Sequence, residues 1–316
     1  MIRRRWLALF LILSIMASLG SLYLYRHSGD VLHNNDVRAS IVFGGLTRTH
    51  IVHTPKLNGT APIPLVLAFH GGGGTGAGMA RLTHLSQLAD KYGFIVAYPD
   101  GYMRRWADGR GTTAAERAGV DDVGFVSALI DQLSKQNQID PTRVYATGIS
   151  NGGFFSLRLA CELSSKITAV AAVAATLPQN LSDHCHPQKP VSILLIHGTD
   201  DPLVPASGGV VGGRIGGEVI SLNATVNLWL QADACMLTPD VTYATEVVND
   251  GTRVKIETFA SCKNSSAVIL YVIEGVGHTW PGGVQFSPES VIGKTTHNID
   301  AGQVIWLFFQ KHSLNA

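Results

Sequence analysis

Continuous apolar runs alternate with helical patterns along most of this chain, and that alternation restricts the possible folds more than any other feature. The run "PIPLVLAFH" ends at His70 and is typical of a strand buried on both faces. It is followed by "RLTHLSQLADKYG", in which Leu82, Leu85 and Leu88 share one helical face and Gly93 provides a stop. The pair therefore predicts a strand at 62–70 and a helix at 81–93.

The same pattern continues to the C-terminus. Further strands are expected at 94–100, 143–148, 167–175, 191–198 and 267–275. Further helices are expected at 120–136, 154–165, 221–234 and 301–312. The exception is 241–259, where Asn249-Asp250-Gly251 separates two alternating segments and predicts a hairpin. Strands that alternate with helices favour an α/β fold with a mostly parallel sheet and helices on both faces.

Composition supports one large domain of this kind. The 316 residues are 46% hydrophobic and only 15% charged, which is enough apolar material for a sizeable core. The net charge of +1 gives no electrostatic reason to expect a nucleic acid or an acidic partner. We find no internal repeat and no second domain boundary.

The N-terminal segment has the composition of an export signal. Three arginines precede an apolar stretch that runs from Trp6 to Tyr25. We expect residues 1–25 to be a signal peptide or a signal anchor, 26–38 a linker, and 39–316 a single catalytic domain. The protein is then secreted or periplasmic, and it touches the inner membrane only through an uncleaved N-terminal segment.

Export changes how the four cysteines are interpreted. Cys161, Cys185, Cys235 and Cys262 are an even set, so two disulfides are expected in an oxidising compartment, with three possible pairings. The competing interpretation is a metal site at His184-Cys185-His186. Neither a CxxC nor an HxxxH spacing supports it, and we expect no metal.

Residues with catalytic chemistry stand where the expected strands end. Ser150 lies in "GISNG", Asp200 and Asp201 lie in "HGTDDP", and His278 lies in "GVGHTW". Ligands of such sheets bind beyond the carboxyl ends of the strands. A serine, a carboxylate and a histidine in this order along the chain match the triad of α/β-hydrolases.

Each residue type suits one part of ester chemistry. A serine hydroxyl needs a neighbouring base, for which His278 is the candidate, and a buried aspartate fixes the tautomer of that base. The oxyanion of the tetrahedral intermediate needs backbone donors, which we assign to the N–H groups of Asn151 and Gly72. Each motif alone is also compatible with an ordinary turn, so the prediction depends on all of them occurring at strand ends.

Six segments together resemble a known family. The chain from about residue 40 onward is similar to the secreted polyhydroxybutyrate depolymerase and feruloyl/acetylxylan esterase group of α/β-hydrolases. The segments are "HGGGGTG", "YPDG", "VDDVGF", "YATGISNGGFFSLRLACE", "HGTDDPLVP" and "GVGHTWPGG". The resemblance implies that Ser150 is the nucleophile, His278 the base and Asp201, rather than Asp200, the acid. It also implies disulfides between neighbouring cysteines, Cys161 with Cys185 and Cys235 with Cys262.

The sequence differs from the esterase group in two respects that bear on its anchoring and its substrates. The leader lacks the cysteine of lipid-anchored members, and no substrate-binding domain follows the catalytic one, so attack on crystalline polyester is not expected. The sequence has no long apolar insertion of the kind that forms a lid, so we expect no large lid domain. Trp280 and Tyr98 are candidate substrate contacts, with core or loop packing as the alternative for each.

The sequence therefore predicts an exported serine carboxylesterase that works through an acyl-enzyme without a cofactor. Its expected partners are esters, including polymeric ones: short hydroxyalkanoate esters of the polyhydroxybutyrate type, or feruloyl and acetyl esters of plant polysaccharide. The alternatives are a catalytically inactive binding module of the same fold and a serine peptidase of the same fold.

Overall fold

A ten-stranded sheet forms the centre of the protein in the computed structural model, which describes residues 33–56, 61–212, 216–259 and 261–314. Its strand order is β1-β2-β4-β3-β5-β6-β7-β12-β11-β10. The strands are β1 (Asp36–Phe43), β2 (Leu46–His53), β3 (Ile63–Phe69), β4 (Ile95–Pro99), β5 (Ile139–Ile149), β6 (Ala169–Val173), β7 (Ser192–Gly198), β10 (Asp240–Tyr243), β11 (Arg253–Phe259) and β12 (Val268–Glu274). A separate two-stranded ribbon consists of β8 (Gly209–Val210) and β9 (Glu218–Val219).

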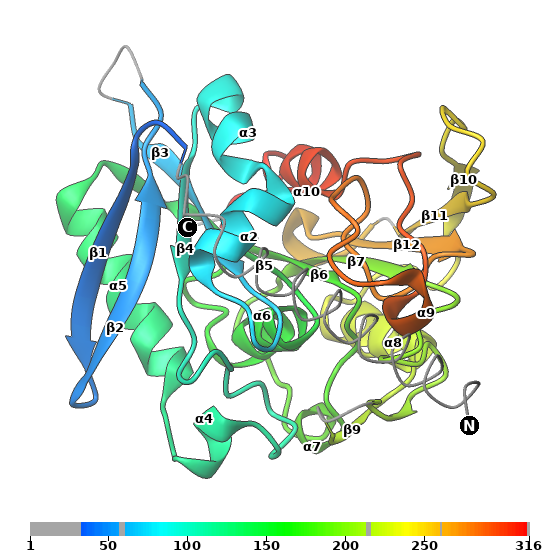
Figure 1. Cartoon of the computed structure of the whole chain (residues 1–316), viewed down its shortest axis with the longest axis horizontal. Coiled ribbons are helices and arrows are strands. Elements are labelled where there is room, and N and C mark those ends of the chain that lie inside the picture. Colours follow the sequence, from blue (N-terminus) through cyan, green and yellow to red (C-terminus); the bar gives the residue numbers. More distant parts are fainter. Residues whose placement is uncertain (1–32, 57–60, 213–215, 260, 315–316) are drawn as a thin grey trace, which may run out of the picture. The chain divides into compact units, whose positions relative to one another are not determined.

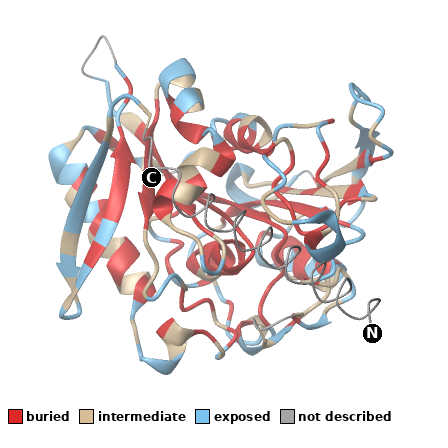
Figure 2. Cartoon of the chain, in the orientation of Figure 1, coloured by how far each residue is buried: buried red, intermediate tan, exposed pale blue. Residues whose placement is uncertain are grey.

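The middle of the sheet is parallel. Strands β4, β3, β5, β6, β7 and β12 pair in parallel, whereas β1 and β2 on one side and β11 and β10 on the other pair antiparallel. The central strands are the most deeply buried part of the molecule, as Figure 2 shows. Leu65 to Phe69 of β3 have no exposed surface, which explains the unbroken apolar run in their sequence.

Helices cover both faces of the sheet (Figure 1). The chain moves from β3 to β4 in one direction along the sheet and from β4 to β5 in the other, so right-handed crossovers place the intervening helices on opposite faces. Helix α10 lies beside α3, where Gln303 Nε2 donates to the hydroxyl of Tyr92 at 2.8 Å. The helices are α2 (Gly76–Thr83), α3 (Leu85–Tyr92), α4 (Ala114–Arg117), α5 (Asp122–Gln136), α6 (Asn151–Glu162), α7 (Gln179–Ser182), α8 (Leu222–Ala232), α9 (Glu289–Ile292) and α10 (Ala301–Phe309), with a 3₁₀ turn at Lys263–Ser265. This is the α/β-hydrolase fold, and the part of the chain that the structure describes contains no large lid domain.

Two local features differ from the sequence prediction. The helix expected at 81–93 is two helices, α2 and α3, because His84 between them has a φ of 52° in the left-handed region. The hairpin of β1 and β2 was not expected. Its turn is Gly44-Gly45, with φ values of +57° and +75° that glycine accommodates. The antiparallel pair expected at 241–259 is present as β10 and β11, but β10 ends at Tyr243, so the connection is longer than the predicted turn at Asn249-Asp250-Gly251.

The expected boundaries meet the structure only in part. Strand β1 begins at Asp36, inside the range 26–38 that we interpreted as a linker. The leader, residues 1–25, lies outside the described residues. Within the ranges that the structure covers, no helix is both long enough and apolar enough to cross a bilayer.

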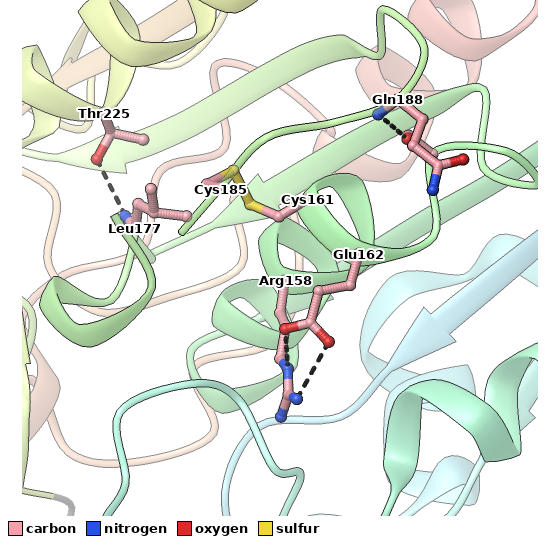
Figure 3. The surroundings of a disulfide bond; sticks show 8 residues. Arg158, Cys161, Glu162, Leu177, Cys185, Gln188 and Thr225 are labelled. Atoms are coloured by element: carbon pink, nitrogen blue, oxygen red, sulfur yellow. Dashed lines mark hydrogen bonds and ion pairs between the residues drawn. A yellow bond between two sulfur atoms is a disulfide. The ribbon is translucent and has the colours of Figure 1, made fainter. Parts of the chain in front are cut away.

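Two disulfides join neighbouring cysteines along the chain. Cys161 is bonded to Cys185, and Cys235 to Cys262. The first fastens the C-terminal end of α6 to the segment after α7, next to the ion pair of Arg158 and Glu162 (Figure 3). Because Cys185 is bonded to sulfur, the motif His184-Cys185-His186 has no thiol to offer a metal.

Candidate active site

Ser150 occupies a strained turn between strand β5 and helix α6. Its φ of 56° and ψ of −121° lie in a region that residues other than glycine rarely adopt, at a cost of about 1–3 kcal/mol. Its N–H donates to the carbonyl of Val173 on the neighbouring strand at 3.0 Å. The turn therefore holds the serine at the carboxyl end of β5, where the helix begins.

Two glycines make this turn possible. A Cβ on Gly148 would lie 2.4 Å from the carbonyl carbon of Gly152, and a Cβ on Gly152 would lie 2.1 Å from the carbonyl oxygen of Phe69. Real Cβ atoms do not approach the backbone this closely. The glycines on either side of Ser150 are thus required by the close packing of β3, β5 and α6.

Asn151 is fixed by its side chain. Its Oδ1 accepts from the N–H of Trp106 at 2.9 Å, and its Nδ2 donates to the carbonyl of Trp106 at 3.1 Å and to Asp108 at 2.5 Å. As the first residue of α6, Asn151 has a backbone N–H without an intrahelical acceptor. The contacts of its side chain therefore hold this backbone donor in place.

The glycine run after β3 lies against the same turn. A Cβ on Gly71 would lie 3.7 Å from the Cβ of Ser150. The N–H of Gly73 donates to Arg104 O at 2.8 Å and that of Gly74 to Gly71 O at 3.0 Å. Within the described ranges, the N–H of Gly72 has no acceptor, so it is available alongside that of Asn151.

The side chain of His70 connects the glycine run after β3 to the loop after β4 by hydrogen bonds. Its Nε2 accepts from the N–H of Gly101 at 3.0 Å, which leaves Nδ1 to donate to the carbonyl of Gly71 at 2.8 Å. Burial lowers the pKa of His70, so the imidazole is neutral, as this pair of roles requires. The histidine at this strand end thus has a positioning role.

Asp201 and His278 form a buried pair beyond β7 and β12. Nδ1 of His278 lies 2.8 Å from Oδ2 of Asp201, and only 4% of the residue surface of His278 is exposed. Oδ1 of Asp201 accepts from the N–H groups of Leu203 and Val204, both at 2.8 Å. Burial alone would raise the pKa of Asp201, but the hydrogen bond and the charge of His278 outweigh it and lower the pKa.

The adjacent carboxylate has a different environment. Asp200 is exposed, and among the described residues its side chain accepts a single hydrogen bond, from the hydroxyl of Thr199 at 2.8 Å. The imidazole of His278 therefore pairs with Asp201, the residue that the family resemblance indicates, and not with Asp200.

The serine and the histidine stand at the same edge of the sheet. Ser150 follows β5 and His278 follows β12, and strands β6 and β7 lie between these two strands in the sheet. The loop that carries His278 is fixed by its N–H, which donates to Ile292 O at 2.5 Å. Among the described residues, the Ser150 hydroxyl and the imidazole share no hydrogen bond. Such contacts are often long in ligand-free enzymes and shorten when substrate binds.

The two aromatic residues predicted as substrate contacts are buried. Tyr98 has no exposed surface, and its hydroxyl lies 3.0 Å from Ser86 Oγ, between β4 and α3. Burial raises its pKa above the usual value. This placement favours the packing alternative for Tyr98. Trp280 is 1% exposed and follows His278 by two residues, so it supports the histidine loop in this structure.

Two buried ion pairs beneath the site were not expected from the sequence. Asp122 bonds Arg48 at 2.6 Å and accepts from the N–H of Ala107 at 2.7 Å. Asp108 bonds Arg110 at 2.7 Å. Both pairs fix the loop that holds Asn151. Asp122 and Arg48 lie far apart in sequence, so no local spacing signals their contact.

Comparison with known proteins assigns the family. Residues 50–179 match the family model described as "Esterase PHB depolymerase". A protein of Nocardia uniformis subsp. tsuyamanensis that is named as an esterase, NocK, is 31% identical over 82% of this chain and 78% of its own length. The chain belongs to the esterase PHB depolymerase family. Membership places it among carboxylic ester hydrolases.

Other relatives of this esterase agree with that placement. Feruloyl esterase B of Piromyces equi is 29% identical over 73% of the chain, which spans 42% of that longer protein. The solved structure of an acetyl xylan esterase from Aspergillus awamori superposes with a TM-score of 0.57 at 15% identity, over 87% of this chain and 99% of the other. At that identity the structural likeness concerns the fold alone.

Proposed function

We propose that this esterase is an exported serine carboxylesterase with Ser150 as nucleophile, His278 as general base and Asp201 as the acid that orients the base. The observation that carries the proposal is the strained Ser150 turn at the same sheet edge as the 2.8 Å pair of His278 and Asp201. Asp201 accepts from Nδ1, which leaves Nε2 of the imidazole as the atom that takes the serine proton.

The reaction proceeds in two halves. Ser150 Oγ attacks the ester carbonyl while His278 Nε2 accepts its proton, and the N–H groups of Gly72 and Asn151 stabilise the oxyanion. The protonated imidazole then gives the proton to the leaving alcohol, which departs and leaves an acyl-enzyme. Water deprotonated by the same imidazole attacks the acyl carbonyl and releases the acid.

The substrates we propose are esters of hydroxyalkanoic acids or feruloyl and acetyl esters of polysaccharide. The family name and the names of the feruloyl and acetyl xylan esterases to which the chain is similar support these classes. Export is supported by the two disulfides, which persist in oxidising compartments.

Labelling and an ester panel test the proposal. A fluorophosphonate probe should label the wild type and not Ser150→Ala, and both proteins should unfold at similar temperatures. Equal labelling of the variant would refute the nucleophile. The panel compares 4-nitrophenyl butyrate, methyl ferulate, acetylated xylan and amorphous hydroxybutyrate polymer. Hydrolysis of none of them would favour an inactive binding module, and cleavage of a peptide in their place would favour a peptidase.

A further inference from the structure

Arg105 packs against the glycine run beside the proposed oxyanion donors. A Cβ on Gly72 would lie 2.6 Å from Nη1 of Arg105 and 3.0 Å from its Cζ. A Cβ on Gly73 would lie 3.3 Å from the same Nη1. Glycine at position 72 therefore makes room for the guanidinium, a requirement separate from its role as a donor.

The loop that carries Arg105 is held at the serine turn. The N–H of Arg105 donates to Tyr102 O at 2.9 Å, which closes a tight turn over residues 102–105. The next residue, Trp106, donates its N–H to Oδ1 of Asn151, directly after Ser150. The backbone of Arg105 is thus held by hydrogen bonds of its own N–H and of the next residue.

The guanidinium has no carboxylate partner among the described residues. Arg48, Arg110, Arg143 and Arg158 are each paired with an aspartate or a glutamate. Arg105 is half-buried, and its single side-chain hydrogen bond goes to the carbonyl of Arg104 at 3.3 Å. Asp108, the carboxylate that acts electrostatically on Arg105, is already bonded to Arg110 and Asn151. A partly desolvated cation without a counter-ion is unfavourable by itself and favours an anionic ligand.

We infer that Arg105 binds a carboxylate of the substrate next to the scissile ester, so that the enzyme prefers acidic esters over neutral ones. This inference rests on the proposed function. Its chemical class is an ester whose acyl or alcohol part bears a free carboxylate, such as a short hydroxyalkanoate oligomer with an unblocked acid end. A guanidinium binds a carboxylate through two parallel N–H donors, and that contact is sensitive to salt.

A matched pair of substrates tests the inference on the full protein. The linear dimer of 3-hydroxybutyrate is compared with its methyl ester, and cleavage of the central ester is measured by chromatography. The variants are Arg105→Gln, Arg105→Lys and the neighbouring, exposed Arg104→Gln as a control for charge.

The wild type should cleave the free acid with a kcat/KM about tenfold above that of the methyl ester. Arg105→Gln should abolish this preference, mainly by raising KM for the free acid, and should change kcat/KM for the methyl ester less than about twofold. Arg105→Lys should keep part of the preference, and Arg104→Gln should keep all of it. Raising NaCl from 0.05 to 0.5 M should lower the preference of the wild type and of Arg104→Gln, and it should change little in Arg105→Gln, which has no preference to lose.

Equal losses on both dimers in Arg105→Gln would overturn the inference, since they would assign Arg105 to the oxyanion or to loop structure. A wild type without preference would overturn it as well. In both cases hydrolysis of 4-nitrophenyl butyrate would still support the proposed function. Absence of that activity and of fluorophosphonate labelling would overturn both proposals.

Discussion

Nδ1 of His278 lies 2.8 Å from Oδ2 of Asp201, while the other oxygen of the same carboxylate accepts two backbone N–H groups. The carboxylate is therefore immobilised by the loop after β7, and it fixes the imidazole in turn. In the mechanism that we propose, this arrangement leaves Nε2 of His278 as the nitrogen that acts on Ser150.

Replacement of the two adjacent aspartates should have unequal effects. In Asp201→Asn the side-chain amide can donate to Nδ1 of His278, which favours the tautomer with the proton on Nε2. That tautomer cannot accept the serine proton, so kcat should fall about 10³- to 10⁴-fold. Asp200→Asn, at an exposed position, should change kcat less than about threefold. Steady-state kinetics with 4-nitrophenyl butyrate measures both, with thermal unfolding as the control for folding. The reverse ranking would move the acid to Asp200.

The turn at Ser150 should not tolerate added atoms. Gly152→Ala would place a methyl group 2.1 Å from the carbonyl oxygen of Phe69, and we expect a loss of about 3 kcal/mol or more in unfolding free energy. The control is Gly78→Ala in α2, where the methyl would lie 3.4 Å from Thr75 Oγ1 and helix propensity improves. Urea denaturation gives both values. Equal stability of the two variants would show that the turn at Ser150 can accommodate a methyl group at position 152.

The central strands and the serine turn were accessible from the sequence because burial on both faces and close glycine packing leave local signatures. Strand β3 and the segment Gly148–Gly152 carry them in a few consecutive residues. The pairing of Arg48 with Asp122 depends on how β2 meets α5, and the contact of Arg105 with Gly72 depends on how the loop after β4 meets the glycine run after β3. Neither contact is local in sequence, so periodicity and motifs do not predict them.

Acidification should destabilise the fold through buried neutral histidines. Burial lowers the pKa of His70 and His197 below the ordinary histidine value of 6.5, and His197 Nε2 lies 3.0 Å from Val204 O. The unfolded chain therefore binds protons that the folded chain does not once the pH falls below about 6.5. Their contribution to stability is complete above that pH and is lost progressively below it.

Urea denaturation at pH 7.5, 6.0 and 5.0 measures this slope. Each such histidine contributes up to about 1.4 kcal/mol per pH unit within its window. His197→Gln should reduce the slope, whereas His184→Gln, at an exposed position, should leave it unchanged. A slope identical in the wild type and His197→Gln would show that His197 is not the source.

The buried pair of Asp108 and Arg110 should contribute through the site it supports. Both side chains have no exposed surface, and Asp108 also accepts from Nδ2 of Asn151. Asp108→Ala leaves a buried guanidinium without its partner, and we expect a loss of about 3–5 kcal/mol in unfolding free energy. The control is Asp131→Ala, which removes an ion pair with Lys166. The side chain of Asp131 is 58% exposed, so the loss in unfolding free energy should be less than about 1 kcal/mol. Asp108 also anchors Asn151, so the folded fraction of Asp108→Ala should have a lower kcat than the wild type on 4-nitrophenyl butyrate. A normal kcat would show that the Asn151 donor is held in place without Asp108.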